Sequence, residues 1–136
     1  MADLLTMAET EIRKRHEFFV DWYRATAAPD AMEDCAASFA PDFRIIWPSG
    51  GSMDRAPLLQ ALKDARGSTG NEFEIRIDIN HAVQLSDALC LITFDEHQET
   101  AKGPNSRRGT AIFSRDARAP NGVLWRYLQE TWIEQV

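Results

Sequence analysis

The sequence is poor in the residues that build metal and redox sites. Its 136 residues include two cysteines, Cys35 and Cys90, and three histidines. The cysteines are far apart and no two histidines lie at the short spacing of metal ligands, so we expect neither a disulfide nor a zinc site. Both cysteines lie among small apolar residues, which predicts buried free thiols in a reducing cytoplasm.

Long apolar runs and an excess of positive charge are also missing. No run approaches the roughly 20 apolar residues that span a bilayer, and the start of the chain does not resemble a signal peptide. We therefore expect a cytoplasmic protein without a membrane partner. Lys and Arg number 15 against 21 Asp and Glu, a formal net charge of −6, which disfavours a nucleic-acid partner. The basic runs at residues 13–15 and 107–108 are interpreted as solvated surface.

The common catalytic and cofactor motifs are absent as well. The sequence has no Gly-x-Ser-x-Gly. Residues 48–52, Pro-Ser-Gly-Gly-Ser, lack the lysine of a phosphate-binding loop and are interpreted as a hairpin turn. No internal repeat, low-complexity tract or linker interrupts the chain. We expect one domain over residues 1–136, without a cofactor.

Helical periodicity dominates the first half of the chain. Residues 6–9, Thr-Met-Ala-Glu, match a capping box, with Asp3 as an alternative helix start. Phe19 and Tyr23 fall on the apolar side of this first helix, and His16 and Trp22 flank it. Asp54 is expected to cap a later helix. The expected helices are residues 6–27, 30–39 and 54–67.

From residue 71 onward the period changes from helical to two. Apolar residues alternate with polar ones, which predicts long strands with one buried face. The expected strands are residues 43–47, 73–83, 88–99, 109–115 and 123–133, with a loop at 102–105. The predicted fold class is α+β, with the N-terminal helices packed in a strongly curved antiparallel sheet. The predicted order is two helices, a short β hairpin around the turn at 48–52, a third helix and four long strands.

A tight turn at residues 86–87 predicts the register of the first two long strands. It places Ile77 opposite Glu96 and His81 opposite Ile92, so that Glu96, His81 and Gln98 share the apolar face. A buried carboxyl has a raised pKa, which suits a general acid or base. Glu96 and His81 are therefore the catalytic candidates. The alternatives are that Glu96 frays outward or pairs with an arginine, and that His81 is a core histidine.

Three segments resemble a known family: residues 39–43, 50–55 and 125–132. Together with the order of helices and strands, they resemble the nuclear transport factor 2-like superfamily, in its SnoaL-like and ketosteroid-isomerase-like branch. The resemblance implies a cone whose inner end forms a pocket and whose outer sheet face forms a homodimer. Relatives often have histidines where Gln129 and Thr131 stand, which predicts that these two side chains face the pocket. Glu130 and Trp132 are then expected to face outward.

These patterns lead to two functional hypotheses. The first is a protein that binds a small hydrophobic molecule, and in its more specific form is a cofactor-free acid–base enzyme of the isomerase, cyclase or dehydratase type. The alternative is a non-catalytic homodimeric interaction module whose cone is filled by side chains. The candidate ligand-binding residues are Phe19, Trp22, Tyr23, Trp47, Gln98, Trp125, Gln129 and Thr131.

Overall fold

The computed structural model of the protein describes residues 3–134. In chain order the elements are α1 Leu4–Tyr23, the 3-10 turn η1 Pro29–Ala31, α2 Met32–Ala37, β1 Phe39–Ile46, β2 Ser52–Asp54, α3 Arg55–Asp64, β3 Glu74–Gln84, β4 Leu89–Thr100, β5 Gly103–Arg115 and β6 Val123–Trp132. The predicted α+β class and the predicted order of the elements are confirmed. None of the described helices is long and apolar enough to cross a bilayer.

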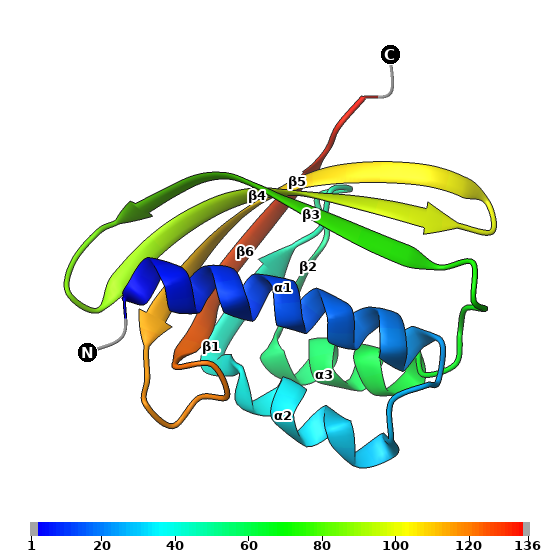
Figure 1. Cartoon of the computed structure of the whole chain (residues 1–136), viewed down its shortest axis with the longest axis horizontal. Coiled ribbons are helices and arrows are strands. Elements are labelled where there is room, and N and C mark those ends of the chain that lie inside the picture. Colours follow the sequence, from blue (N-terminus) through cyan, green and yellow to red (C-terminus); the bar gives the residue numbers. More distant parts are fainter. Residues whose placement is uncertain (1–2, 135–136) are drawn as a thin grey trace.

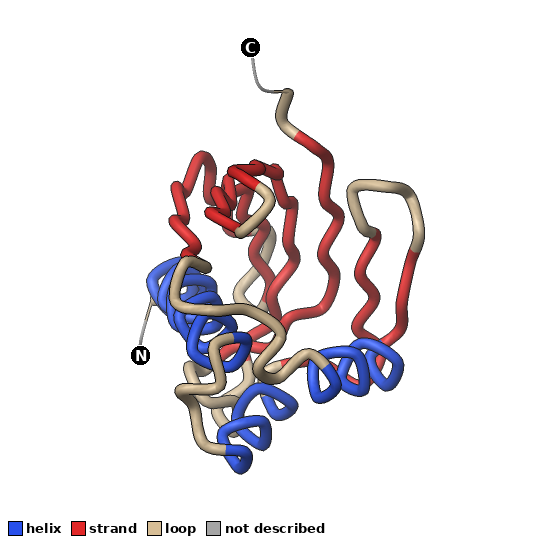
Figure 2. Tube along the Cα trace, turned by 90° about the vertical axis from the view of Figure 1, so that its right-hand side faces the viewer, coloured by secondary structure: helices blue, strands red, loops and turns tan. Residues whose placement is uncertain are grey.

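The six strands form one open, curved sheet in the order β2-β1-β6-β5-β4-β3. Neighbouring strands are antiparallel except β1 and β6, which run parallel, so the sheet is mixed rather than purely antiparallel. The sheet curls around α1, while α2 and α3 lie beyond its lower edge (Figures 1 and 2). This curvature creates an inner face that α1 covers over part of its area.

The ends of α1 differ from the predicted ones at both sides. Asp3 is the N-cap, and its carboxylate accepts a hydrogen bond from the backbone N–H of Thr6 at 3.0 Å, so the alternative start is the correct one. The helix ends at Tyr23 rather than near residue 27, because Ala25 adopts a positive φ of 62° and turns the chain. β5 begins at Gly103, where a loop was predicted.

A β-bulge divides the pairing of β3 and β4 into a predicted and an unpredicted part. Ile77 lies opposite Glu96 and Ile79 lies opposite Phe94, as the turn predicted. Between Ile79 and His81 the register shifts, so His81 pairs with Thr93 instead of Ile92. One extra residue turns the following side chains to the other face. The prediction that His81 shares the apolar face is therefore wrong, and His81 is exposed.

A second bulge reverses the expected faces at the end of β6. Trp125 pairs with Phe113, but Tyr127 pairs with the next residue of β5, Ile112. Between these two pairs β6 advances by two residues while β5 advances by one, so the bulge is one extra residue in β6. After the bulge, the inner positions are Leu128 and Glu130, which are buried. Gln129 and Thr131 are exposed, so their predicted inward orientation is wrong, and so is the outward orientation predicted for Glu130.

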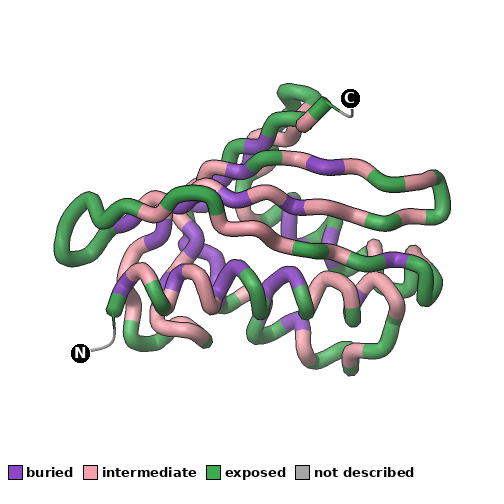
Figure 3. The backbone as a smooth tube through the Cα atoms, turned by 45° about the horizontal axis from the view of Figure 1, so that its top comes forward, coloured by how far each residue is buried: buried purple, intermediate pink, exposed green. Residues whose placement is uncertain are grey.

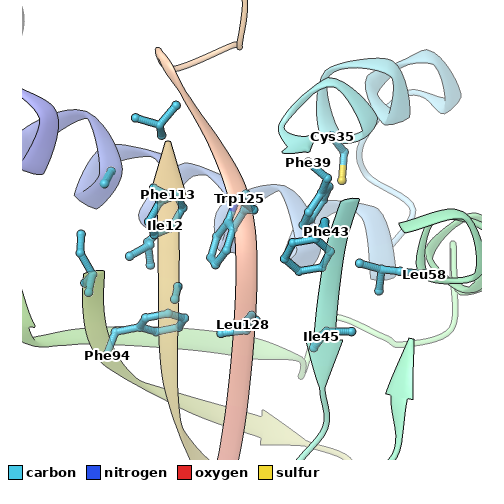
Figure 4. Packing of buried hydrophobic residues seen from close by; sticks show 14 of the residues in the cluster. Ile12, Cys35, Phe39, Phe43, Ile45, Leu58, Phe94, Phe113, Trp125 and Leu128 are labelled. Carbon is cyan, nitrogen blue, oxygen red and sulfur yellow. The ribbon is translucent and has the colours of Figure 1, made fainter. Parts of the chain in front are cut away.

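The core is organised around Trp125 on the inner face of the sheet. Its ring lies 4.5 Å from that of Phe113 and 6.1 Å from that of Phe39, measured between centroids. Figure 4 shows these rings packed side by side across β5, β6 and β1. Buried positions along the strands alternate with exposed or half-buried ones (Figure 3). The inner face is thus densely packed at the level of Trp125.

Candidate functional site

Beyond Trp125 the inner face is no longer filled, and a cavity opens between the sheet, α1 and α3. It contains about 610 Å³ of empty space when its open mouth is included. One wall is apolar and comes from β1, α3 and β6. This wall consists of Phe39, Phe43, Ile45, Leu58, Leu62 and Leu128.

A second part of the cavity wall carries polar side chains from four elements. They are His16 and Tyr23 of α1, Glu96 and Gln98 of β4, Arg107 of β5 and Glu130 of β6. An apolar hollow with a few convergent polar groups is the usual form of a small-molecule site. Within residues 3–134, His, Cys, Asp and Glu side chains form no group of three that would hold a metal ion.

Glu96 is fully paired on this wall. Its Oε1 lies 3.1 Å from Nε2 of His16, and its Oε2 accepts a hydrogen bond from Nε2 of Gln98 at 2.5 Å. Nδ1 of His16 lies 2.7 Å from the carbonyl oxygen of Ile12, the acceptor that directs the other ring nitrogen at Glu96.

Burial opposes charge on both members of the Glu96–His16 pair, but their attraction outweighs it. Desolvation by itself would raise the pKa of Glu96, whereas His16, Gln98 and Arg107 lower that pKa to about 2. Desolvation likewise opposes protonation of His16, and the Glu96 carboxylate raises the pKa of His16 in spite of it. Both ring nitrogens of His16 face oxygen acceptors, Nδ1 the carbonyl of Ile12 and Nε2 the carboxylate of Glu96, so the geometry favours a buried carboxylate–imidazolium ion pair.

Glu130 is also buried, but it is paired less closely than Glu96. Only 6% of the residue is exposed, and its carboxyl forms no hydrogen bond with any residue of the described chain. Nη1 of Arg107 lies 3.7 Å from its Oε1, within ion-pair distance but beyond hydrogen-bond distance. Burial and the charge of Glu96 raise the pKa of Glu130 to about 7. This carboxyl is therefore poised to gain or lose a proton near neutral pH.

Two further polar groups of the cavity wall lack hydrogen-bond partners within residues 3–134. They are Nε of Arg107 and the hydroxyl of Tyr23. Burial, and then the charge of Glu96, raise the pKa of Tyr23. The hydroxyl therefore keeps its proton at neutral pH and is available as a donor.

The structure brings six of the ten predicted site residues to the cavity. Phe19, Tyr23, Trp47, Glu96, Gln98 and Trp125 line it. The other four lie elsewhere. Trp22 is a core residue whose Nε1 donates to the carbonyl of Leu62 at 2.6 Å, and the two bulges place His81, Gln129 and Thr131 away from the cavity.

Three polar residues of the cavity were not selected from the sequence. His16 was placed only beside the apolar side of the first helix, although it precedes Phe19 and Tyr23 at helical spacing. Arg107 was assigned to solvated surface with its neighbour, whereas alternation along β5 turns Arg107 inward and Arg108 outward to Asp95. Glu130 had no local signal, because its face depends on the bulge in β6. Arg15, of the other basic run, is also buried.

Comparisons with known proteins agree with this architecture. A nuclear transport factor 2-like protein of unknown function from Pseudomonas aeruginosa superposes with a TM-score of 0.80 at 27% identity, covering 94% of this chain and 99% of that one. A cystatin-like domain from Nostoc punctiforme gives 0.67 at 13%, covering 94% and 78%. A ketosteroid isomerase-like protein from Erwinia carotovora gives 0.59 at 16%, covering 88% and 95%.

These similarities define the fold as nuclear transport factor 2-like, which confirms the predicted resemblance. Residues 10–134 match the model of the family named sucrose-6-phosphate phosphohydrolase C-terminal, and the chain belongs to that family. No curated protein matches the sequence.

Proposed function

We propose that the cavity binds a small, mainly apolar molecule and that Glu130 transfers a proton to or from it, as in an isomerase, cyclase or dehydratase. The observation that carries the proposal is the buried carboxyl of Glu130, which lines a mainly apolar cavity, forms no hydrogen bond and has a pKa of about 7. A general acid–base group works best when its pKa is close to the working pH. Such a transfer needs no cofactor, since the side chain itself holds the proton.

The neighbouring groups fit supporting roles in this chemistry. Glu96 stays ionised beside His16, and its negative charge holds the proton on Glu130. Two carboxyls with widely separated pKa values are a common arrangement for acid–base work. Glu96 is thus proposed as a positioning residue rather than as the acid itself. Tyr23 offers an O–H donor to an oxygen that gains negative charge during the reaction.

A phosphorylated ligand fits the cavity less well. His16 faces Glu96 at 3.1 Å, and Arg107 faces Glu130 at 3.7 Å, so the positive charge on the cavity wall is already opposed by carboxyls. The phosphohydrolase in the family name therefore does not by itself suggest a phosphate site in this chain.

Exchange of an acidic C–H tests the proposed proton transfer. We expect the protein to accelerate exchange of the α-protons of 4-phenylbutan-2-one into D₂O, as measured by proton NMR. Glu130→Gln is expected to lower the rate about a hundredfold or more, because general acid–base groups contribute factors of about 10² to 10⁴. The matched control is Glu99→Gln, which alters an exposed carboxyl of β4. Equal rates for wild type and Glu130→Gln would remove Glu130 from the reaction.

We also propose a homodimer formed through the outer face of the sheet. That face carries ion pairs between neighbouring strands, such as Arg108 with Asp95 at 2.7 Å. Trp132, half-exposed, was predicted to lie there, but its ring lies 4.8 Å from the guanidinium of Arg107, on the side of Glu130. The proposed interface therefore consists of the outer face of the sheet and does not include Trp132. A monomer in sedimentation velocity at micromolar concentration would contradict it.

A further inference from the structure

The polar groups of the cavity wall that lack hydrogen bonds restrict the ligands that the cavity accepts. This reasoning rests on the proposed function, because it assumes that a small molecule occupies the cavity. Glu130, Tyr23 and Arg107 all line the cavity, and the carboxyl, the hydroxyl and Nε of Arg107 form no hydrogen bond within residues 3–134. A ligand that covers these groups removes them from water, so it gains affinity by forming hydrogen bonds with them.

The Tyr23 hydroxyl and the Glu130 carboxyl require different hydrogen-bond partners on the ligand. The Tyr23 hydroxyl brings a proton, which calls for an acceptor on the ligand. A carboxyl has two oxygens and at most one proton, so Glu130 retains an oxygen that only accepts, whatever its protonation state. That oxygen calls for a donor on the ligand. A head group that satisfies both residues must therefore accept one hydrogen bond and donate another.

Charged head groups do not meet this requirement. A carboxylate or phosphate oxyanion offers acceptors only, and an ammonium group offers donors only. Each would also bring a net charge beside an apolar wall, where His16 already pairs with Glu96 and Arg107 with Glu130. An uncharged alcohol or carboxamide both donates and accepts.

The rest of the cavity describes the body of the ligand. The wall formed by β1 and α3 is apolar, with Phe43, Ile45 and Leu58 among its residues. We infer that the cavity is selective for uncharged ligands in which an apolar body carries one head group that can both donate and accept a hydrogen bond. Glu130 and Tyr23 form the hydrogen bonds to this head group.

Five probes with the same ring test this inference. Toluene has no polar head, benzyl alcohol and benzamide have the proposed kind, and benzoate and benzylamine are charged at pH 7. Binding is measured by ligand-observed NMR titration. We expect benzyl alcohol or benzamide to bind about tenfold more tightly than toluene, because one to two net hydrogen bonds are gained. Benzoate and benzylamine are expected to bind more weakly than the preferred uncharged probe.

Two variants assign the preference to the named residues. Glu130→Leu and Tyr23→Phe are each expected to reduce the preference for the polar probe over toluene about fivefold while leaving toluene bound. Tyr127→Phe is the matched control, since Tyr127 does not line the cavity. Tighter binding of the alcohol would show that one ligand atom satisfies both residues. Tighter binding of the amide would show that the donor and the acceptor have to be separate atoms of the head group.

The outcomes separate this inference from the proposed function. If toluene binds as tightly as the alcohol and the amide, or if benzoate or benzylamine binds most tightly, the inferred ligand class is wrong, although the cavity still binds small apolar molecules. If none of the five probes binds at millimolar concentration, the proposed function fails together with the inference.

Discussion

Two buried glutamates on the concave side of the sheet show how differently one residue type is used. Glu11 of α1 is completely buried and accepts hydrogen bonds from Nε and Nη2 of Arg15, Nδ2 of Asn121 and Nε1 of Trp125, at 2.9, 3.2, 2.9 and 2.8 Å. Glu130 of β6 is nearly as buried and accepts none. Full pairing makes Glu11 a structural group, whereas Glu130 remains available to a ligand.

The surroundings of the two carboxyls explain the contrast. Glu11 lies next to Trp125, where side chains fill the inner face and supply donors from three segments of the chain. Glu130 lies beyond the filled region, where Arg107 comes no closer than 3.7 Å and Glu96 adds negative charge. Buried polar groups that stay unpaired lower stability, and proteins tolerate them most often at functional sites.

The largest expected effect comes from removing the paired carboxyl. Glu11→Leu leaves Arg15 buried without its partner and Trp125 without an acceptor, so the free energy of unfolding should fall by about 3 to 5 kcal/mol. Urea denaturation monitored by tryptophan fluorescence measures it. Glu17→Leu, at an exposed position of the same helix, should change stability by no more than about 0.5 kcal/mol. A loss below about 1 kcal/mol for Glu11→Leu would show that the cluster is not structural.

Removing the carboxyl of Glu130 should raise stability, in contrast to removing that of Glu11, and the size of this effect should depend on pH. The pKa of Glu130 is raised from 4.5 to about 7 in the folded state, so folding takes up a proton between these values. The stability that this protonation provides is present below pH 4.5 and is lost as the pH rises through 7. The wild type should therefore lose roughly 2 to 3 kcal/mol relative to Glu130→Gln between pH 5 and pH 8.

Urea unfolding of both proteins at the two pH values measures this difference. Both proteins retain the Glu96–His16 pair, so the comparison removes most of that pair's own pH dependence. Glu99→Gln, which removes an exposed carboxyl, should follow the wild type at both pH values. Parallel pH profiles for wild type and Glu130→Gln would mean that Glu130 titrates normally, and the contrast with Glu11 would then lose its basis.

The smallest effect is expected at His81. Because the bulge in β3 turns it to the exposed face, His81→Ala should change stability by about 0.5 kcal/mol or less. It should also leave both proton exchange and toluene binding unchanged. A loss of toluene affinity in this variant, measured by the same NMR titration, would place His81 back in the site.

Local patterns were sufficient to predict much of the site. Alternation along β4 predicted that Glu96 and Gln98 share the inner face with Phe94, and helical spacing predicted that Phe19 and Tyr23 share one side of α1. Each of these predictions needs only the period of one element and a short turn. Gln129, Thr131 and His81 were misplaced because each follows a bulge, and one extra residue reverses every later side chain.

The sequence by itself determined the α+β class, the order of helices and strands, the apolar inner face and the presence of a carboxyl on it. Periodicity of two and of 3.6 residues is a local property that any segment carries with it. Only the tertiary structure decided that Glu130 is the buried carboxyl without a hydrogen bond and that His16, 80 residues away in the chain, neutralises Glu96. Bulges and helix docking depend on packing between distant segments, which no local pattern encodes.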